Sequence, residues 1–107
     1  MKESFEVFVN SNDMSWQKAS EYSEGTLVKV LRDNDGRKTV LLKLPPDFKM
    51  LEHTHTCIEQ HFVLEGQYEM GKREFGQGSY QMIPPGVTHG PFTSAKGATI
   101  LIIWDPL

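Results

Sequence analysis

The sequence has one cysteine, Cys57, among 107 residues, so it cannot form an internal disulfide. Its longest apolar run, residues 98–104, is far shorter than the roughly 20 residues that a membrane-spanning helix needs. The first residues include Glu3 and Glu6 and have no apolar stretch of the signal-peptide kind. The formal net charge of −3 comes without any basic stripe. These absences predict a cytoplasmic protein that uses neither a membrane nor a nucleic acid as a partner.

A sustained 3.6-residue apolar period is also missing. Short β-rich stretches alternate instead with turn signals, and they predict about nine strands: residues 5–9, 26–32, 37–44, 51–65, 67–70, 73–75, 79–83, 90–94 and 97–104. Asp35-Gly36 and Gly71-Lys72 favour tight hairpin turns. The pattern predicts one all-β domain over residues 1–107, a sandwich or barrel. An edge strand and a long loop occupy residues 1–25, and the barrel covers about residues 26–105.

Three of the four histidines lie within residues 52–61. If this segment is extended, His53, His55, Glu59 and His61 share one face, because side chains alternate along a strand. The fourth histidine, His89, follows a Pro-Pro-Gly turn far downstream. Imidazole and carboxylate together suit divalent first-row ions, namely Fe, Mn, Co, Ni, Cu and Zn. The two segments are therefore candidates for one divalent metal site, with metal identity left open.

Two separate blocks of the sequence resemble the two motifs of the cupins: His53-x-His55-x3-Glu59-x6-Gly66 and Gly78-x5-Pro84-x-Gly86-x2-His89. The first motif usually opens with a glycine where this chain has Asp47, and the second usually closes with an asparagine where it has Thr93. The resemblance implies the cupin double-stranded β-helix, a small jelly-roll barrel. It also implies a metal ligand set of His53, His55, Glu59 and His89.

A looser likeness spans most of the chain. Met14-Ser15-Trp16, residues 25–30, Gly36-Arg37-Lys38-Thr39 and the second motif resemble the ChrR-type cupins. That group includes the zinc-binding sensory domain of ChrR-type anti-sigma factors, and dioxygenases that cleave carbon–carbon bonds in diketones and hydroxyketones. The likeness implies a metal-dependent, Fe(II)-type dioxygenase with a small substrate of this kind. The alternatives are a zinc-binding sensory module, or a non-catalytic small-molecule binding cupin that forms a homodimer through residues 5–9.

Two further residues share the inward parity of the motif. His61 is a candidate catalytic residue, as a pocket base, or else a hydrogen-bond donor that supports a metal ligand. The alternative is a hydrogen-bonded core histidine. Cys57 is either an additional thiolate ligand or, more commonly for a free cysteine, a small buried apolar residue.

Overall fold

The computed structural model describes residues 6–106 and leaves residues 1–5 and 107 undescribed. The prediction of an all-β chain is confirmed, because the described elements are ten strands and one short 3-10 helix. They are η1 Ser11–Asp13, β1 Gln17–Lys18, β2 Leu27–Asn34, β3 Arg37–Leu44, β4 Phe48–Met50, β5 Ile58–Gly66, β6 Tyr68–Met70, β7 Arg73–Phe75, β8 Tyr80–Ile83, β9 Phe92–Ser94 and β10 Ala98–Asp105.

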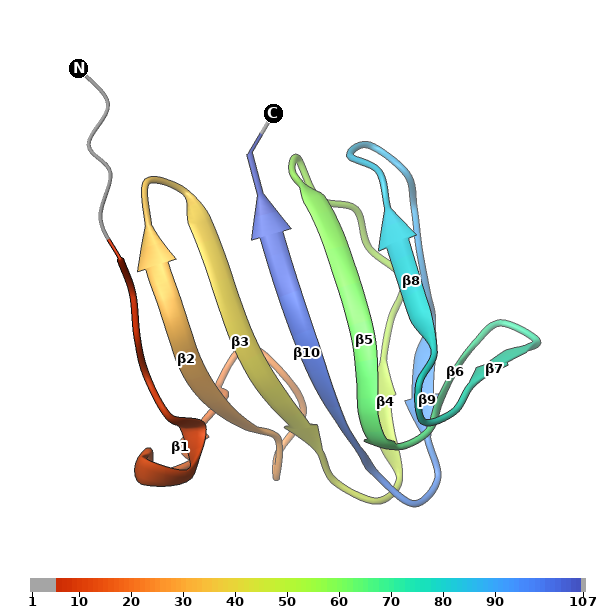
Figure 1. Cartoon of the computed structure of the whole chain (residues 1–107). Coiled ribbons are helices and arrows are strands. Elements are labelled where there is room, and N and C mark those ends of the chain that lie inside the picture. Colours follow the sequence, from red (N-terminus) through yellow and green to blue (C-terminus); the bar gives the residue numbers. More distant parts are fainter. Residues whose placement is uncertain (1–5, 107) are drawn as a thin grey trace.

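The strands form two antiparallel sheets (Figure 1). The larger sheet has the order β1-β2-β3-β10-β5-β8, and the smaller one has the order β4-β9-β6-β7. Strand β10 pairs with β3 on one side and with β5 on the other. The last strand in the sequence is thus the centre of the larger sheet, and the strand that carries Glu59 and His61 lies directly beside it.

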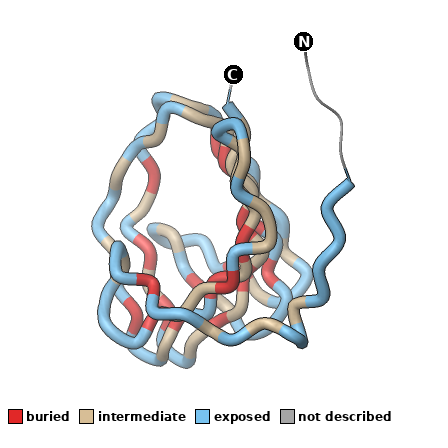
Figure 2. Tube along the Cα trace, turned by 90° about the vertical axis from the view of Figure 1, so that its left-hand side faces the viewer, coloured by how far each residue is buried: buried red, intermediate tan, exposed pale blue. Residues whose placement is uncertain are grey.

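The core follows from the period-two alternation of these long strands. In β3 the alternating residues Val40, Leu42 and Leu44 are buried, and in β10 Ala98, Ile100 and Ile102 are buried. Buried positions alternate with more exposed ones along the chain trace (Figure 2). The smaller sheet adds Phe48, Tyr68, Phe75 and Phe92 to the same apolar cluster. In β5 the inward positions are instead Glu59, His61 and Val63, so the alternation carries two ionisable groups into the core.

Three sequence-based predictions need correction. Residues 6–9 form no strand, and Phe5 of the predicted edge strand lies outside the described residues. The predicted strand over residues 51–65 begins only at Ile58, and the preceding residues form a loop with an isolated bridge at His53. The loop predicted over residues 10–25 contains η1 and β1, and the three-residue strand β4 was not predicted. Dimerisation through residues 5–9 stays a prediction.

None of the helices in the described part of the chain is long and apolar enough to cross a membrane.

Close backbone contact explains two glycines at the base of the larger sheet. Gly66 ends β5 with a φ of +77°, and a Cβ there would lie 2.3 Å from the carbonyl oxygen of Gly97. Gly97 has a φ of +93°, and a Cβ there would lie 2.7 Å from the carbonyl oxygen of Leu44. Both positions therefore require glycine for its left-handed conformation and for its lack of a side chain. Gly66, the last residue of the first motif, thus allows the end of β5 to lie against the backbone of Gly97.

We expect Gly66→Ala to destabilise the fold by about 3 kcal/mol or more, because backbone atoms must move to admit the methyl group. Gly71→Ala is the matched control. Gly71 also has a left-handed φ, +63°, but no atom lies within 4 Å of its Cβ position. Gly71→Ala should lower the free energy of unfolding by only about 1–2 kcal/mol, which is what a left-handed φ costs an L residue. Urea unfolding of both variants measures the difference, and equal losses would contradict the contact explanation.

Candidate metal centre

The two motif segments are joined by a short backbone bridge. The His53 amide donates to the His89 carbonyl and the His89 amide donates to the His53 carbonyl, each at 2.9 Å. Three residues before His89, the Gly86 amide donates to the carbonyl of His55, also at 2.9 Å. Residues 53–55 are therefore held against residues 86–89, although they lie more than 30 positions apart in sequence.

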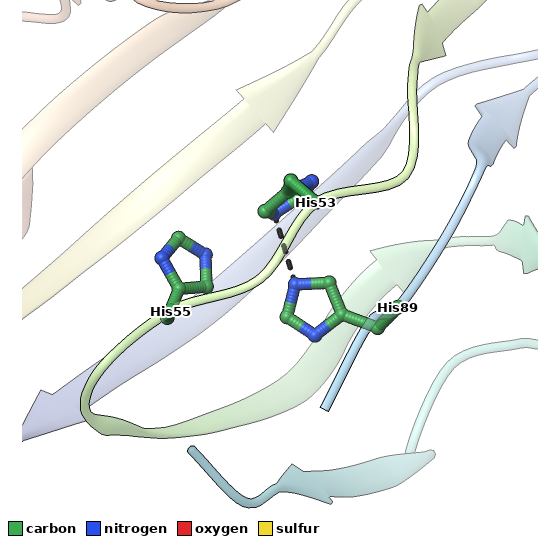
Figure 3. Close-up of side chains that lie close together, drawn as sticks. All are labelled: His53, His55 and His89. Carbon is green, nitrogen blue, oxygen red and sulfur yellow. Dashed lines mark hydrogen bonds between the residues drawn. The ribbon is translucent and has the colours of Figure 1, made fainter. Parts of the chain in front are cut away.

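Three imidazoles converge at this bridge (Figure 3). His53, His55 and His89 each offer a ring nitrogen, and these three atoms all lie within 4.8 Å of one another. His53 Nε2 lies 2.9 Å from His89 Nε2. His53 Nδ1 donates to the carbonyl of Leu51 at 3.1 Å, because a carbonyl can only accept. In the neutral ring this leaves the Nε2 lone pair facing His89, which is how a metal-binding histidine is oriented.

The carboxylate of Glu59 lies beside the histidines in the barrel interior. Glu59 is 4% exposed, and its Oε2 atom is hydrogen-bonded to Nε2 of His61. Its Oε1 atom is also buried and makes no hydrogen bond, although His55 Nε2 lies 2.8 Å away. Burial raises the pKa of the Glu59 carboxyl, but the hydrogen bond and charge of His61, together with His55, outweigh it and lower the pKa overall. Glu59 is therefore ionised at neutral pH.

These donors fit a divalent cation. Ligands held at about 2.1 Å from one ion, at right angles, lie about 3 Å apart. The His53–His89 and His55–Glu59 pairs are separated by 2.9 and 2.8 Å. Burial lowers the pKa of His89 to about 4, so this imidazole is neutral at pH 7 and its lone pair is available. A cation would also satisfy Glu59 Oε1, which the protein leaves without a hydrogen bond.

The predicted ligands have different positions in the site. The close group contains His53, His55 and His89, and Glu59 adjoins it through His55. Cys57 is not part of the group. Burial, and then the charge of Glu59, raise the pKa of its thiol, so it stays protonated at neutral pH. The ligand set of three histidines and Glu59 stays a prediction.

His61 belongs to a hydrogen-bonded chain that sequence reasoning missed. Its Nδ1 lies 2.9 Å from the hydroxyl of Tyr68, and that hydroxyl donates to Oε1 of Gln81 at 2.9 Å. The Gln81 amide in turn contacts the sulfur of Met70 at 3.3 Å. No sequence signal could have found this chain, because it joins β5 and β8 of the larger sheet to β6 of the smaller sheet.

A small, mostly apolar cavity lies behind the site. Its volume is about 30 Å³, room for about two water molecules. His53, Glu59 and His61 form its polar wall, and the remaining lining is largely aliphatic and aromatic, including Leu42, Phe48, Phe92, Ile100 and Ile102. His53 and His55 themselves are half-buried, so the histidine cluster is open to solvent on its other side.

Comparison with known proteins decides the family. The family model described as "ChrR Cupin-like domain" matches residues 4–107. The chain belongs to the ChrR cupin-like family. This confirms the resemblance inferred from the two motifs. A comparison with curated protein sequences gives no match.

Solved cupins share the fold. An RmlC-like cupin protein from Ralstonia eutropha is 24% identical, with a TM-score of 0.79 over 91% of this chain and 66% of that one. An acetylacetone dioxygenase from Acinetobacter johnsonii is 16% identical, with a TM-score of 0.83 over 97% and 76%. A structure of Rhodobacter sphaeroides SigE in complex with the anti-sigma ChrR gives 20% identity and a TM-score of 0.71 over 90% and 52%. The cupin chain thus spans between half and three quarters of these proteins. The predicted jelly-roll fold is confirmed.

We expect the alkaline stability of this cupin to depend on Tyr22, which lines the cavity. Burial, and then the charges of Glu59 and Glu21, raise the pKa of Tyr22 from 10.0 to about 12. Between these pH values the unfolded chain loses the tyrosine proton while the folded chain keeps it. The free energy of unfolding should therefore fall by up to about 1.4 kcal/mol per pH unit.

Tyr22→Phe should flatten this alkaline decline only in part, because burial also raises the pKa of Tyr68. Urea unfolding of the variant and the wild type at pH 8, 10 and 11.5 measures how the free energy of unfolding declines with pH. Identical slopes for the variant and the wild type would contradict the raised pKa of Tyr22.

His55→Ala should lose the metal and the stability that the metal confers. A ligand that binds only the folded state raises its stability. The wild-type melting temperature should rise with added Zn²⁺ and fall with a chelator, whereas that of His55→Ala should respond to neither. Thr54→Ala is the matched control, because Thr54 is exposed in the same loop. A histidine variant that responds to Zn²⁺ like Thr54→Ala would argue against the centre.

Proposed function

We propose that this cupin is a metal-dependent, Fe(II)-type dioxygenase that cleaves a carbon–carbon bond in a small diketone or hydroxyketone. The observation that carries the proposal is the convergence of three imidazoles within 4.8 Å beside an ionised, buried carboxylate. Such a set leaves positions on an octahedral ion free for other ligands, which distinguishes catalytic metal sites from closed structural ones. The structural likeness to an acetylacetone dioxygenase supports the choice of substrate class.

The chain's residues have defined roles in this proposal. His53, His55 and His89 would hold the ion as neutral ligands, and Glu59 would offset part of its charge. A metal bound there would supply Lewis acidity toward the substrate oxygens and one-electron chemistry with dioxygen. Because the cavity holds about 30 Å³, the bulk of a substrate would lie on the exposed side of the histidines.

The reaction needs no co-reactant other than dioxygen. In a 1,3-diketone, one bond between the central carbon and a carbonyl carbon breaks. One oxygen atom enters the carboxylic acid product and the other becomes the new carbonyl of a 1,2-dicarbonyl product. The substrate is oxidised and dioxygen is reduced, so atoms and electrons balance without an external reductant.

A zinc-binding sensory module is the second candidate, and the family assignment favours it. The likeness to a structure of SigE in complex with the anti-sigma ChrR adds support. In that function the same donors would hold Zn²⁺. A small ligand or an oxidant that reaches the open side of the site would change the affinity for a protein partner. The two functions differ in the resident metal and in whether dioxygen is consumed.

Oxygen uptake tests the proposal. Protein loaded anaerobically with Fe(II) should consume one dioxygen per molecule of 2,4-pentanedione, or of another member of a diketone and hydroxyketone panel, and release a carboxylic acid. His55→Ala should lower the rate by about 100-fold or more, whereas Thr54→Ala should retain it. Iron-loaded protein that takes up no oxygen across the panel would contradict the dioxygenase, and Zn²⁺ in protein purified without added metal would then favour the sensory module.

A further inference from the structure

We infer that His61, held by Tyr68 and Gln81, is a positioning residue that fixes the Glu59 carboxylate so that one oxygen alone faces the histidine cluster. The inference rests on the proposed metal centre and assigns a role to a residue that stands at an unspecified position of the first cupin motif. It chooses between the two functional roles considered for His61, because both ring nitrogens already have partners within the protein.

The two oxygens of Glu59 have different surroundings. Oε2 accepts a hydrogen bond from His61 Nε2, since a carboxylate oxygen cannot donate. Oε1 has no hydrogen-bond partner and lies 2.8 Å from His55 Nε2. An unpartnered buried carboxylate oxygen is costly, so this arrangement persists only if something holds the group or completes it. His61 does the first, and a cation beside His55 would do the second.

His61 is itself held by a buried tyrosine. His61 is 6% exposed, and Tyr68 is 1% exposed. The Tyr68 ring stacks on Phe75 with centroids 5.0 Å apart, which fixes the hydroxyl 2.9 Å from His61 Nδ1. The same hydroxyl donates to Gln81 on β8. Three strands, β5, β6 and β8, therefore determine one rotamer of His61 and, through it, one direction of the Glu59 carboxylate.

Partners of this kind orient metal ligands and typically change metal affinity by about 10- to 100-fold. Without His61, the Glu59 carboxylate could turn and present either oxygen, or both, to the ion. The loss should therefore appear in the geometry of the bound metal as well as in its affinity.

The test uses Zn²⁺ affinity, measured by competition with a chromophoric chelator, and the visible absorption spectrum of the Co²⁺-loaded protein. His61→Leu should bind Zn²⁺ about 10- to 100-fold more weakly and show an altered Co²⁺ spectrum. His61→Gln keeps a donor near Nε2 and should recover part of both. Tyr68→Phe removes only the hydroxyl and should give a smaller change in the same direction, which keeps the test decisive if His61→Leu does not fold.

Tyr80→Phe is the matched control for Tyr68→Phe. Tyr80 is 57% exposed, and its hydroxyl donates to Gln60, whose position in β5 points away from the core. It should change neither readout. A residue that only stabilises the fold would lower the melting temperature of the metal-free protein and leave affinity and spectrum unchanged. Wild-type affinity and spectrum in both His61→Leu and Tyr68→Phe would overturn the inference alone, whereas wild-type protein that binds neither ion would overturn the metal centre with it.

Discussion

The site depends on one backbone contact, the pair of hydrogen bonds between His53 and His89. Neither residue belongs to a named strand, so neither inherits its position from a sheet. The bridge sets the two segments side by side, and the Gly86 amide on the carbonyl of His55 fixes their register a second time. Ligands in loops are usually placed less accurately than ligands in strands. Here the two reciprocal backbone hydrogen bonds hold His53 and His89 in place, as the hydrogen bonds between paired strands hold residues within a sheet.

The second constraint is electrostatic. Burying an ionised carboxylate costs several kcal/mol unless partners compensate. Glu59 is buried among aliphatic residues of β3 and β10, and its compensation comes from His61 and His55. Each of these partners needs its own support, and His61 finds it in Tyr68. A polar network that is only partly satisfied is costly, so the unpartnered Oε1 of Glu59 is where this structure gains most from a cation.

Much of the fold and of the candidate site could be predicted from the sequence, and the physical reason differs from residue to residue. Period-two alternation correctly placed Glu59 and His61 on the inner face, because both lie in a true strand. The same alternation wrongly extended that strand back to Leu51, since the β-branched threonines between the histidines mimic strand composition. Residues 6–9 have high β-propensity but no pairing strand in the described structure.

Other features depend on contacts that a linear pattern does not contain. The three residues of β4 are too few to show a period. Gln81 lies opposite His61 through the register of β5 and β8, whereas Tyr68 reaches both side chains from β6 of the other sheet. Asp47, where cupins usually have glycine, adopts a φ of +61°, a conformation that aspartate tolerates better than most residues. The departure from the motif therefore keeps the turn that the glycine would make.

The fold alone does not select between catalysis and sensing, because both kinds of cupin share it at low identity. The shape of the site narrows the choice of ligand in either case. The cavity behind Glu59 admits only about two water molecules, while the half-buried His53 and His55 leave the cluster open on the other side. A metal here would be shielded on the cavity side and accessible to small molecules on the side of His53 and His55. Either function would therefore require a molecule that approaches the ion from the His55 side, so the residues around His55 would discriminate between ligands more than the barrel core would.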